Sequence, residues 1–405
     1  MIGRMRLRQL RPLAVVLAVL TLAAGCGKSA PQAAPAAADA PYVGHHSTAT
    51  IPPPQPLRAG ERFEAVNLAR PYQPKPPHGG TDEYRCFLID PHIATPTFLT
   101  GSQFLPQNND IVHHAIVYRV DPADVAQAKA LDDHDPGDGW TCFGGTGVRS
   151  SAISGLGDLT GGSWIGAWAP GASETLFTAN VGYPLAPGSQ LVLQIHYNLL
   201  ETNGKAGPTD ESGVRLRLHD GGPGTLTPLN TLLVAAPIEL PCTSAEKGPL
   251  CDRTAALADL NARFGAEAVG MVRGLNFLCN GGQAPTPGDT QHCDQKVTSN
   301  SLIYSVAGHM HLLGKAIKVE LNPGTPNAKV LLDLPQFNFD DQGARPMATP
   351  VAIKPGDTLR VTCTYDASLR SKLPELKPLQ PRYVMWGDGT SDEMCLAIMA
   401  TARTA

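Results

Sequence analysis

Short runs in which hydrophobic and polar residues alternate follow one another along the chain after position 60. Each run is rich in β-branched or aromatic residues and is bounded by Gly, Pro, Asn or Asp. Alternation with a period of two, closed by turn residues, is typical of strands with one face in a core. The runs are YRCFLI, DIVHHAIVYRV, SQLVLQIHYNLL, VRLRLHD, TLLVAAPIEL, SLIYSVAGHMHL, AIKVEL, DTLRVTCTYD and EMCLAIMA.

Only one segment has a clearly helical pattern. Asp252 can cap it, Leu257, Leu260 and Phe264 share one face, and Gly265 is expected to end it. Many strands with so little helix predict an all-β protein. We expect two tandem antiparallel β-sandwich domains of jelly-roll-like form, with the short helix in an insert.

The length of 405 residues leaves room for two such domains after residue 60. The Gly-Gly-Pro-Gly stretch at 221–224 is the best boundary, so the predicted domains are 60–222 and 223–405. An insert at 241–295 holds four cysteines and the helix. It is interpreted as a stapled surface excursion without chemistry of its own.

The N-terminus has the organisation of an export signal. Residues 1–12 carry four Arg and no acid, an apolar stretch follows, and the segment ends in Ala-Ala-Gly before Cys26. This resembles the lipobox of bacterial lipoproteins, which implies that 1–25 are removed and Cys26 is acylated. The expected location is then the cell envelope, on its periplasmic or outer-membrane face; an ordinary secretory peptide is the alternative. Residues 26–59 are rich in Ala and Pro and predict an extended tether, in which His45-His46 is expected to be solvated.

Charge excludes one class of partner. The net charge is −4, and loss of the four Arg of the signal makes it −8, which argues against a generally basic nucleic-acid binder. No run of 18 apolar residues occurs, so no spanning helix is expected in the mature protein.

The cysteines fit an exported protein. Apart from Cys26 there are eight, which predicts four disulfides, although eight cysteines allow 105 pairings. The short loops favour Cys242 with Cys251 and Cys279 with Cys293. Cys-X-X-Cys spacing, which zinc ribbons and thioredoxin-type centres need, does not occur.

Five histidines lie in strand-like runs and are candidate metal ligands. His309 and His311 are two residues apart and therefore share one face of a strand, as do Gln194 and His196. Adjacent residues point to opposite faces. His113 and His114 can therefore join one site only at a strand end or a bulge.

The order of these motifs resembles a known family. His-His, Gln-X-His-Tyr, His-X-His-X-X-Gly-Lys and Asp-Glu-Met-Cys follow one another here as in the copper type II, ascorbate-dependent monooxygenases, to which peptidylglycine α-hydroxylating monooxygenase and dopamine β-monooxygenase belong. EYRC at 83–86 and KPGDTLRVTCTYD at 354–366 also match. The resemblance covers roughly 60–405 and is weakest in the insert.

The resemblance implies two coppers per chain. One would be held by His113, His114 and His196 in the N-terminal domain, and the other by His309, His311 and Met394 in the C-terminal domain. Three imidazoles suit copper in either oxidation state, and a thioether with two imidazoles suits Cu(I). By the same resemblance Cys86 would pair with Cys142, and Cys363 with Cys395.

The reaction implied is hydroxylation of an aliphatic C–H bond of a small molecule with O₂ and ascorbate, or another one-electron reductant. The site with Met394, His309 and His311 would activate O₂. The gap between the coppers would be open to solvent, with Gln194 and Tyr84 near the N-terminal site.

The sequence departs from the peptidylglycine enzymes where these hold the substrate carboxylate. Their Arg, Asn and Tyr are replaced by Ala307, Leu396 and Ile398, which predicts an apolar pocket and argues against peptidylglycine substrates. Aromatic amines stay an open alternative, although no acid stands out as a partner for their ammonium group, beside a neutral or apolar molecule. A copper-handling surface lipoprotein without turnover is the alternative function. Its ligands would be the same six residues.

Overall fold

The computed structural model describes residues 51–77, 81–142, 145–148, 164–169, 172–199, 202, 209–339, 341–387, 389 and 391–404. The predicted signal at 1–25, Cys26, and His45-His46 lie outside the described residues, as does all of the predicted tether before residue 51. Residues 43–405 form one compact unit. Within the described ranges, no helix combines the length and the hydropathy that a membrane crossing requires.

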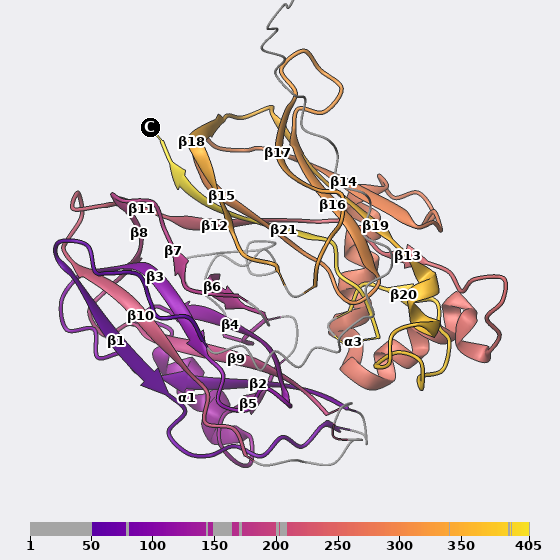
Figure 1. Ribbon diagram of the computed structural model, residues 1–405, viewed down its shortest axis with the longest axis horizontal. Coiled ribbons are helices and arrows are strands. Elements are labelled where there is room, and N and C mark those ends of the chain that lie inside the picture. The colour runs from indigo at the N-terminus through magenta and orange to yellow at the C-terminus, as the bar shows by residue number, and fades with distance from the viewer. Residues whose placement is uncertain are drawn as a thin grey trace, which may run out of the picture. The chain divides into compact units, whose positions relative to one another are not determined.

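The strands up to residue 228 form two sheets (Figure 1). The first has the order β1-β10-β3-β8-β11 with β7 on β3, and consists of β1 (Glu61–Asn67), β3 (Thr97–Leu105), β7 (Thr175–Leu176), β8 (Val181–Leu185), β10 (Gly213–Asp220) and β11 (Thr227–Pro228). The second is ordered β5 (Trp140–Thr141), β2 (Asp82–Ile89), β9 (Gln190–Asn198), β4 (Val112–Val120) and β6 (Trp164–Trp168).

The strands after residue 229 form a separate set. One sheet is ordered β12 (Asn230–Ala235), β21 (Leu396–Arg403), β15 (Ser301–His309) and β18 (Arg345–Ile353), and the other β14 (Thr290–Lys296), β19 (Thr358–Tyr365), β16 (Gly314–Leu321) and β17 (Lys329–Leu334). A two-stranded piece joins β13 (Glu239–Leu240) to β20 (Val384–Met385). Pairing is antiparallel between all these strands except β8 and β11. The all-β prediction is confirmed, and the boundary at 222–223 stays a prediction.

The alternating runs form strands because each can bury one face. In β19, Leu359, Val361, Cys363 and Tyr365 are buried while the residues between them are only partly buried. β9 and β3 each lie in the middle of a sheet, and they are buried along both faces. The second set of strands has one hydrophobic core, whose buried residues lie between Leu233 and Met399 in the sequence. Ala400 and Ala402 pack into the core of the first set instead.

The helix predicted from Asp252 is longer than expected. The Asp252 side chain accepts a hydrogen bond from the Ala255 amide at 2.9 Å, which confirms the cap. Gly265 leaves the helical region with φ 83°, but a second helical segment follows at once, and the two make α3 (Arg253–Cys279). The prediction of a single helix is wrong, because α1 (Val125–His134) also forms, with only Ala128 buried. Short 3₁₀ turns are η2 (Pro249–Cys251) and η3 (Ala367–Ser371).

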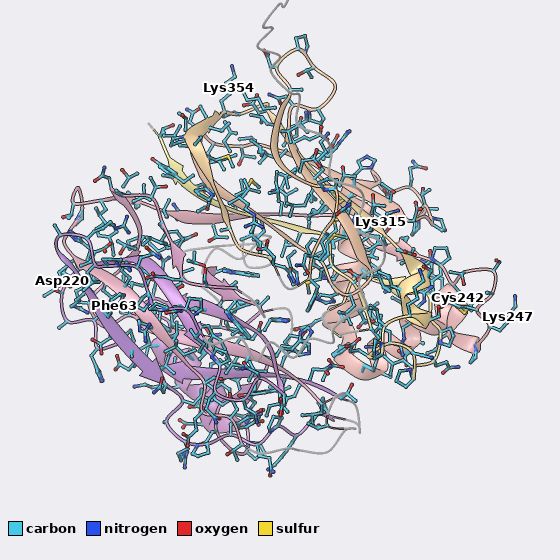
Figure 2. The ribbon with its side chains drawn as sticks, in the orientation of Figure 1. Phe63, Asp220, Cys242, Lys247, Lys315 and Lys354 are labelled. Atoms are coloured by element: carbon cyan, nitrogen blue, oxygen red, sulfur yellow. A yellow bond between two sulfur atoms is a disulfide. The ribbon has the colours of Figure 1, made fainter. Side chains whose placement is uncertain are left out.

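All four predicted disulfides are present: Cys86–Cys142, Cys242–Cys251, Cys279–Cys293 and Cys363–Cys395. Two of them hold the insert, one before α3 and one at its C-terminal end. Cys242 lies on the loop that leads to α3, with Lys247 beyond it (Figure 2).

A buried arginine fastens the edge of the first sheet. Arg217 of β10 is completely buried and contacts Glu61 at 2.9 Å and Glu174 at 2.8 Å. Its guanidinium also lies over the ring of Phe63 on the neighbouring β1, at 4.8 Å from the ring centroid. It donates further to the backbone carbonyls of Gln55 and Pro56, at 2.6 Å and 3.1 Å.

We predict that Arg217→Met lowers the free energy of unfolding by about 3–5 kcal/mol, because it leaves the buried Glu174 without its cation and Glu61 with only the partly exposed Arg58. Urea unfolding measures the change. Arg215→Met is the matched control on the same strand, since its partner is the neutral amide of Gln103, and it should cost about 1 kcal/mol. Equal losses in the two variants would contradict the prediction.

Candidate metal centre

Three histidines of the second sheet converge, and a bulge makes this possible. The pairing of β4 with β9 places Val112 opposite Tyr197 and His114 opposite His196, so His113 is an extra residue in its strand. A bulge turns adjacent side chains that would otherwise face opposite ways. The prediction that His113 and His114 need a bulge or a strand end to share a site is confirmed.

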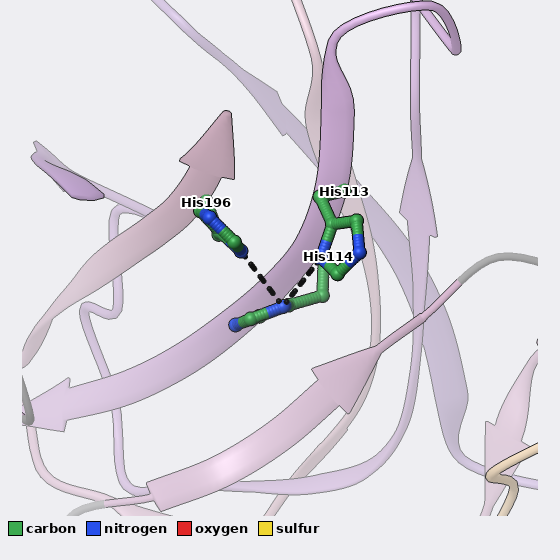
Figure 3. A group of neighbouring side chains, drawn as sticks. All are labelled: His113, His114 and His196. Carbon is green, nitrogen blue, oxygen red and sulfur yellow. Dashed lines mark hydrogen bonds between the residues drawn. The ribbon is translucent and has the colours of Figure 1, made fainter. Parts of the chain in front are cut away.

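The three rings meet through the same kind of nitrogen. His114 Nδ1 lies 3.2 Å from His113 Nδ1 and 3.3 Å from His196 Nδ1 (Figure 3). The group has the geometry of a metal site, with one ligand atom from each ring within 4.8 Å of the others. Burial, with the neighbouring imidazoles, holds the pKa of His114 well below its usual range. Its ring is therefore neutral, the form that binds metal.

Asp82 and Tyr84 orient His196 from the neighbouring strand β2. His196 Nε2 lies 2.9 Å from Asp82 Oδ1, so Nε2–H donates and the lone pair is left on Nδ1. The Tyr84 ring stacks on His196 with centroids 4.1 Å apart and planes at 9°. A carboxylate behind a ligand imidazole is the usual support of metal-binding histidines. Asp82 was not among the site residues predicted from the sequence, although Asp82 lies two residues before Tyr84 and therefore on the same face of the strand.

Gln194 lies on the same face of β9 but points at a disulfide. Its amide nitrogen is 3.4 Å from Cys142 Sγ and 3.3 Å from the Gly145 carbonyl oxygen. Gln194 and Tyr84 are both buried. Tyr84 therefore contacts the three-histidine group directly, whereas Gln194 contacts Cys142 of the disulfide and the Gly145 carbonyl.

The second group lies at the end of β15. His309 is its last residue and His311 follows two positions later, with ring centroids 5.3 Å apart. His309 Nδ1 lies 2.7 Å from Gln342 Oε1, and the Gln342 amide nitrogen donates to the Phe339 carbonyl at 2.8 Å, which fixes the amide orientation. His309 Nδ1–H is therefore the donor, and its lone pair is on Nε2.

His311 has the same tautomer for a different reason. Its Nδ1 lies 3.2 Å from the backbone oxygen of Asp392, which only accepts. Its Nε2 is buried and has no hydrogen-bond partner among the described residues. Burial lowers the pKa of His309 to about 4, although the hydrogen bond that its Nδ1–H donates to Gln342 acts in the opposite direction. Burial, with His309 beside it, lowers the pKa of His311 to about 3.

Met394 lies on the segment that flanks His311. The carboxylate of Glu393 accepts from the His311 amide at 2.8 Å and from the Leu313 amide at 2.6 Å. The Tyr365 hydroxyl donates to the Met394 carbonyl at 3.1 Å, and the Met394 side chain is partly buried against the core. The Cys363–Cys395 disulfide begins at the next residue.

The two groups adjoin each other. The rings of His114 and His309 are 6.0 Å apart, and Phe339 lies 5.2 Å from His113. His114, His196 and His311 are buried. This differs from the solvent-open gap that the resemblance implied. The segment carrying Phe339 and Gln342 contacts both groups.

The donor set fits copper. Three imidazoles presenting Nδ1 would accept copper in either oxidation state. The buried Nε2 of His311, which has no hydrogen-bond partner among the described residues, is the kind of atom that a metal satisfies. Carboxylates lie behind the rings and none is in the three-histidine group, which makes the set unlike the oxygen-rich sites of Mg²⁺ and Ca²⁺.

Comparison with known proteins supports the same chemistry. Residues 285–400 match the family model described as the C-terminal domain of copper type II ascorbate-dependent monooxygenases. A human protein named DBH-like monooxygenase protein 2 is 26% identical over 294 residues, which is 72% of this chain and 47% of that protein. The chain thus spans about half the length of this curated relative.

The solved structures that align with the chain do so only at low identity and low TM-score. An allantoicase aligns with 75% of this chain and 86% of its own at 10% identity, with a TM-score of 0.18. A Paenibacillus xanthan lyase aligns with 80% of this chain and 23% of its own at 10% identity, with a TM-score of 0.19.

The low pKa values of His309 and His311 predict that the metal-free protein loses stability as the pH falls from 6.5 to about 4. In this pH window the two imidazoles bind protons in the unfolded chain but stay unprotonated in the folded protein, so acid favours unfolding. Denaturant unfolding at several pH values measures the slope. His309→Gln should flatten it, whereas His292→Gln, which removes an exposed histidine, should not. A slope unchanged by His309→Gln would show that this ring is not held neutral.

Proposed function

We propose that the chain is a copper type II ascorbate-dependent monooxygenase and that it hydroxylates an aliphatic C–H bond of a small molecule; the match of residues 285–400 to the family model supports this. The observation that carries the proposal is the convergence of the Nδ1 atoms of His113, His114 and His196 at a strand bulge. Copper analysis, with anaerobic reduction by ascorbate of the protein lacking residues 1–26, tests it.

We propose two coppers per chain. His113, His114 and His196 would hold one through Nδ1, with Asp82 fixing the third ring. His309 and His311 would hold the other through Nε2, and Met394 would add a thioether. A weak neutral sulfur donor favours Cu(I). It needs a rigid support, which the Cys363–Cys395 disulfide and the Tyr365 hydroxyl supply.

When bound, copper in this family supplies O₂ activation, so that one oxygen atom enters the C–H bond, the other leaves as water, and two electrons come from ascorbate or another reductant. The chain contributes ligand geometry and a buried environment. His309 and His311, with lowered pKa values and fixed tautomers, would present their lone pairs without prior deprotonation. Burial of His114 and His311 keeps bulk water from these rings. Tyr84 supports His196, and Gln194 packs behind the same group.

The proposed substrate is neutral or apolar. Ala307 pairs with Ile398 and His309 with Leu396 across β15 and β21, so these side chains lie on the face that carries His309. A carboxylate placed there would meet apolar side chains at those three positions, which is unfavourable without a charged partner.

A cavity of about 180 Å³ lies further along this face, where Ser305 pairs with Ala400. Its lining includes Phe177, Leu229 and Tyr304. Glu174 also lines it, but that carboxylate is engaged by Arg217. The cavity therefore suits an uncharged group.

The alternative function is copper handling without turnover, by a lipoprotein anchored through Cys26. It uses the same six ligands. Substrate-stimulated, ascorbate-dependent O₂ uptake separates the two, and metabolic labelling with a radioactive fatty acid, with Cys26→Ser as control, tests the anchor.

We predict that His311→Ala loses one copper and retains the other, because the two ligand sets belong to different sheets. Metal analysis of the dialysed protein measures this. His292→Ala, at an exposed histidine, should retain both. Loss of both coppers from His311→Ala would favour a single shared cluster.

Met394→Ile keeps the apolar volume and removes the sulfur, so the fold and the three-histidine site should survive. We expect weaker Cu(I) binding at the second site, loss of the sulfur scatterer from its X-ray absorption spectrum, and collapse of ascorbate-driven hydroxylation. Turnover at the wild-type rate would make Met394 a core residue instead of a ligand.

A further inference from the structure

We propose that Arg263, in the helix of the insert, is a positioning residue for the second metal site. It would hold the Asp392 segment so that the Asp392 carbonyl fixes the tautomer of His311. This rests on the proposed function for its copper consequence, whereas the effect on His311 itself is independent of metal. The insert would then contribute to the site instead of being an inert excursion.

The contact between Arg263 and Asp392 is two-pronged. Arg263 Nη1 lies 2.8 Å from Asp392 Oδ2, and Nη2 lies 2.7 Å from Oδ1. The Asp392 side chain is only 4% exposed. A bidentate arginine–carboxylate pair fixes orientation as well as charge. Asp392 therefore cannot rotate without losing a buried ion pair.

Asp392 transmits that orientation to the ligand. Its backbone oxygen is the acceptor for His311 Nδ1, at 3.2 Å, and this bond leaves Nε2 with the lone pair. The adjacent Glu393 accepts from the amides of His311 and Leu313. The 392–393 segment therefore sets both the ring and the backbone of the His311 turn.

Arg263 is itself held by the helix and the loop after η3. Its Nε donates to Asp259 Oδ2 at 2.8 Å, and the same oxygen accepts from Arg382 at 2.8 Å. Its guanidinium lies 4.7 Å from the ring centroid of Phe264. The helical geometry breaks at Gly265, directly after this pair.

Two glycines leave the space that the ion pair occupies. A Cβ at Gly387 would lie 2.8 Å from Asp392 Oδ2, and one at Gly389 would lie 2.7 Å from the same atom and 3.0 Å from Arg263 Nη1. Real Cβ atoms essentially never come closer than 3.0 Å to such neighbours. The loop is thus shaped around the Arg263–Asp392 contact.

The insert is tied at both ends to the scaffold of the site. Cys242–Cys251 closes the loop before α3, and Cys279–Cys293 joins its end to β14. β14 pairs with β19, which carries Cys363, and Cys363 is bonded to Cys395 beside Met394. The helix therefore has a rigid frame from which to hold Asp392.

The test compares Arg263→Gln with Arg253→Gln. Arg253 is the matched control, because it lies on the same helix and makes a similar two-pronged pair, with the buried Glu239 at 2.7 Å and 2.6 Å, but does not contact Asp392. Nitrogen NMR of the imidazoles in the metal-free protein reads the tautomer of His311, assigned with His311→Ala. Cu(I) titration reads the affinity of each site.

We expect wild type and Arg253→Gln to hold His311 as the Nδ1–H tautomer, and Arg263→Gln to give a mixture of tautomers. Cu(I) affinity at the second site should fall about 10- to 100-fold in Arg263→Gln, while the three-histidine site keeps its affinity. Arg263→Lys, which keeps the charge but not the fork, should lie between. If Arg263→Gln does not fold, Arg263→Lys is compared with Arg253→Gln and the wild type instead.

An unchanged His311 tautomer in a folded Arg263→Gln or Arg263→Lys protein would overturn the inference and leave Arg263 a purely structural residue. If the tautomer responds as expected but the wild type binds no copper, the proposed function fails while the positioning role stands. The two failures are therefore distinguishable.

Discussion

A buried imidazole can serve as a metal ligand only when it is neutral and when one nitrogen is committed to another partner. Burial supplies the first condition, since it lowers the pKa of His114, His309 and His311 below the usual range. An acceptor behind the ring supplies the second. Most of the site's surroundings serve this second requirement.

The two groups meet the requirement in different ways. In the three-histidine group a carboxylate on a neighbouring strand accepts from His196 Nε2, so that Nδ1 faces the centre. In the second group a side-chain amide and a backbone carbonyl accept from the Nδ1 atoms of His309 and His311, so that Nε2 faces the centre. A metal ion in the first group would therefore be bound through Nδ1, and one in the second group through Nε2.

The disulfides and the insert make the surroundings of the candidate ligands rigid. Cys86–Cys142 lies behind Gln194, and Cys363–Cys395 begins beside Met394. The helix of the insert reaches the Asp392 segment through Arg263. A thioether ligand imposes little geometry by itself, so rigidity must come from the surrounding chain.

The sequence by itself predicted the all-β fold class, the presence of four disulfides and the candidate ligands, whereas the pairings Cys86–Cys142 and Cys363–Cys395 rested on the resemblance. Period-two alternation reports which face of a strand is buried, and motif order carries the resemblance. The sequence also predicted that His113 and His114 could join one site only at a strand end or a bulge, because adjacent residues of a regular strand point to opposite faces. Asp82 could have been found in the same way, from its spacing to Tyr84.

Only the tertiary structure decided the rest. The tautomers depend on Gln342 and on the Asp392 carbonyl, which lie 33 and 81 residues from their histidines. The contact of Arg263 with Asp392 and the approach of His114 to His309 are likewise long-range. Local pattern carries no information about such pairs, because they are set by the packing of sheets and helix whose contacts are distant in the chain.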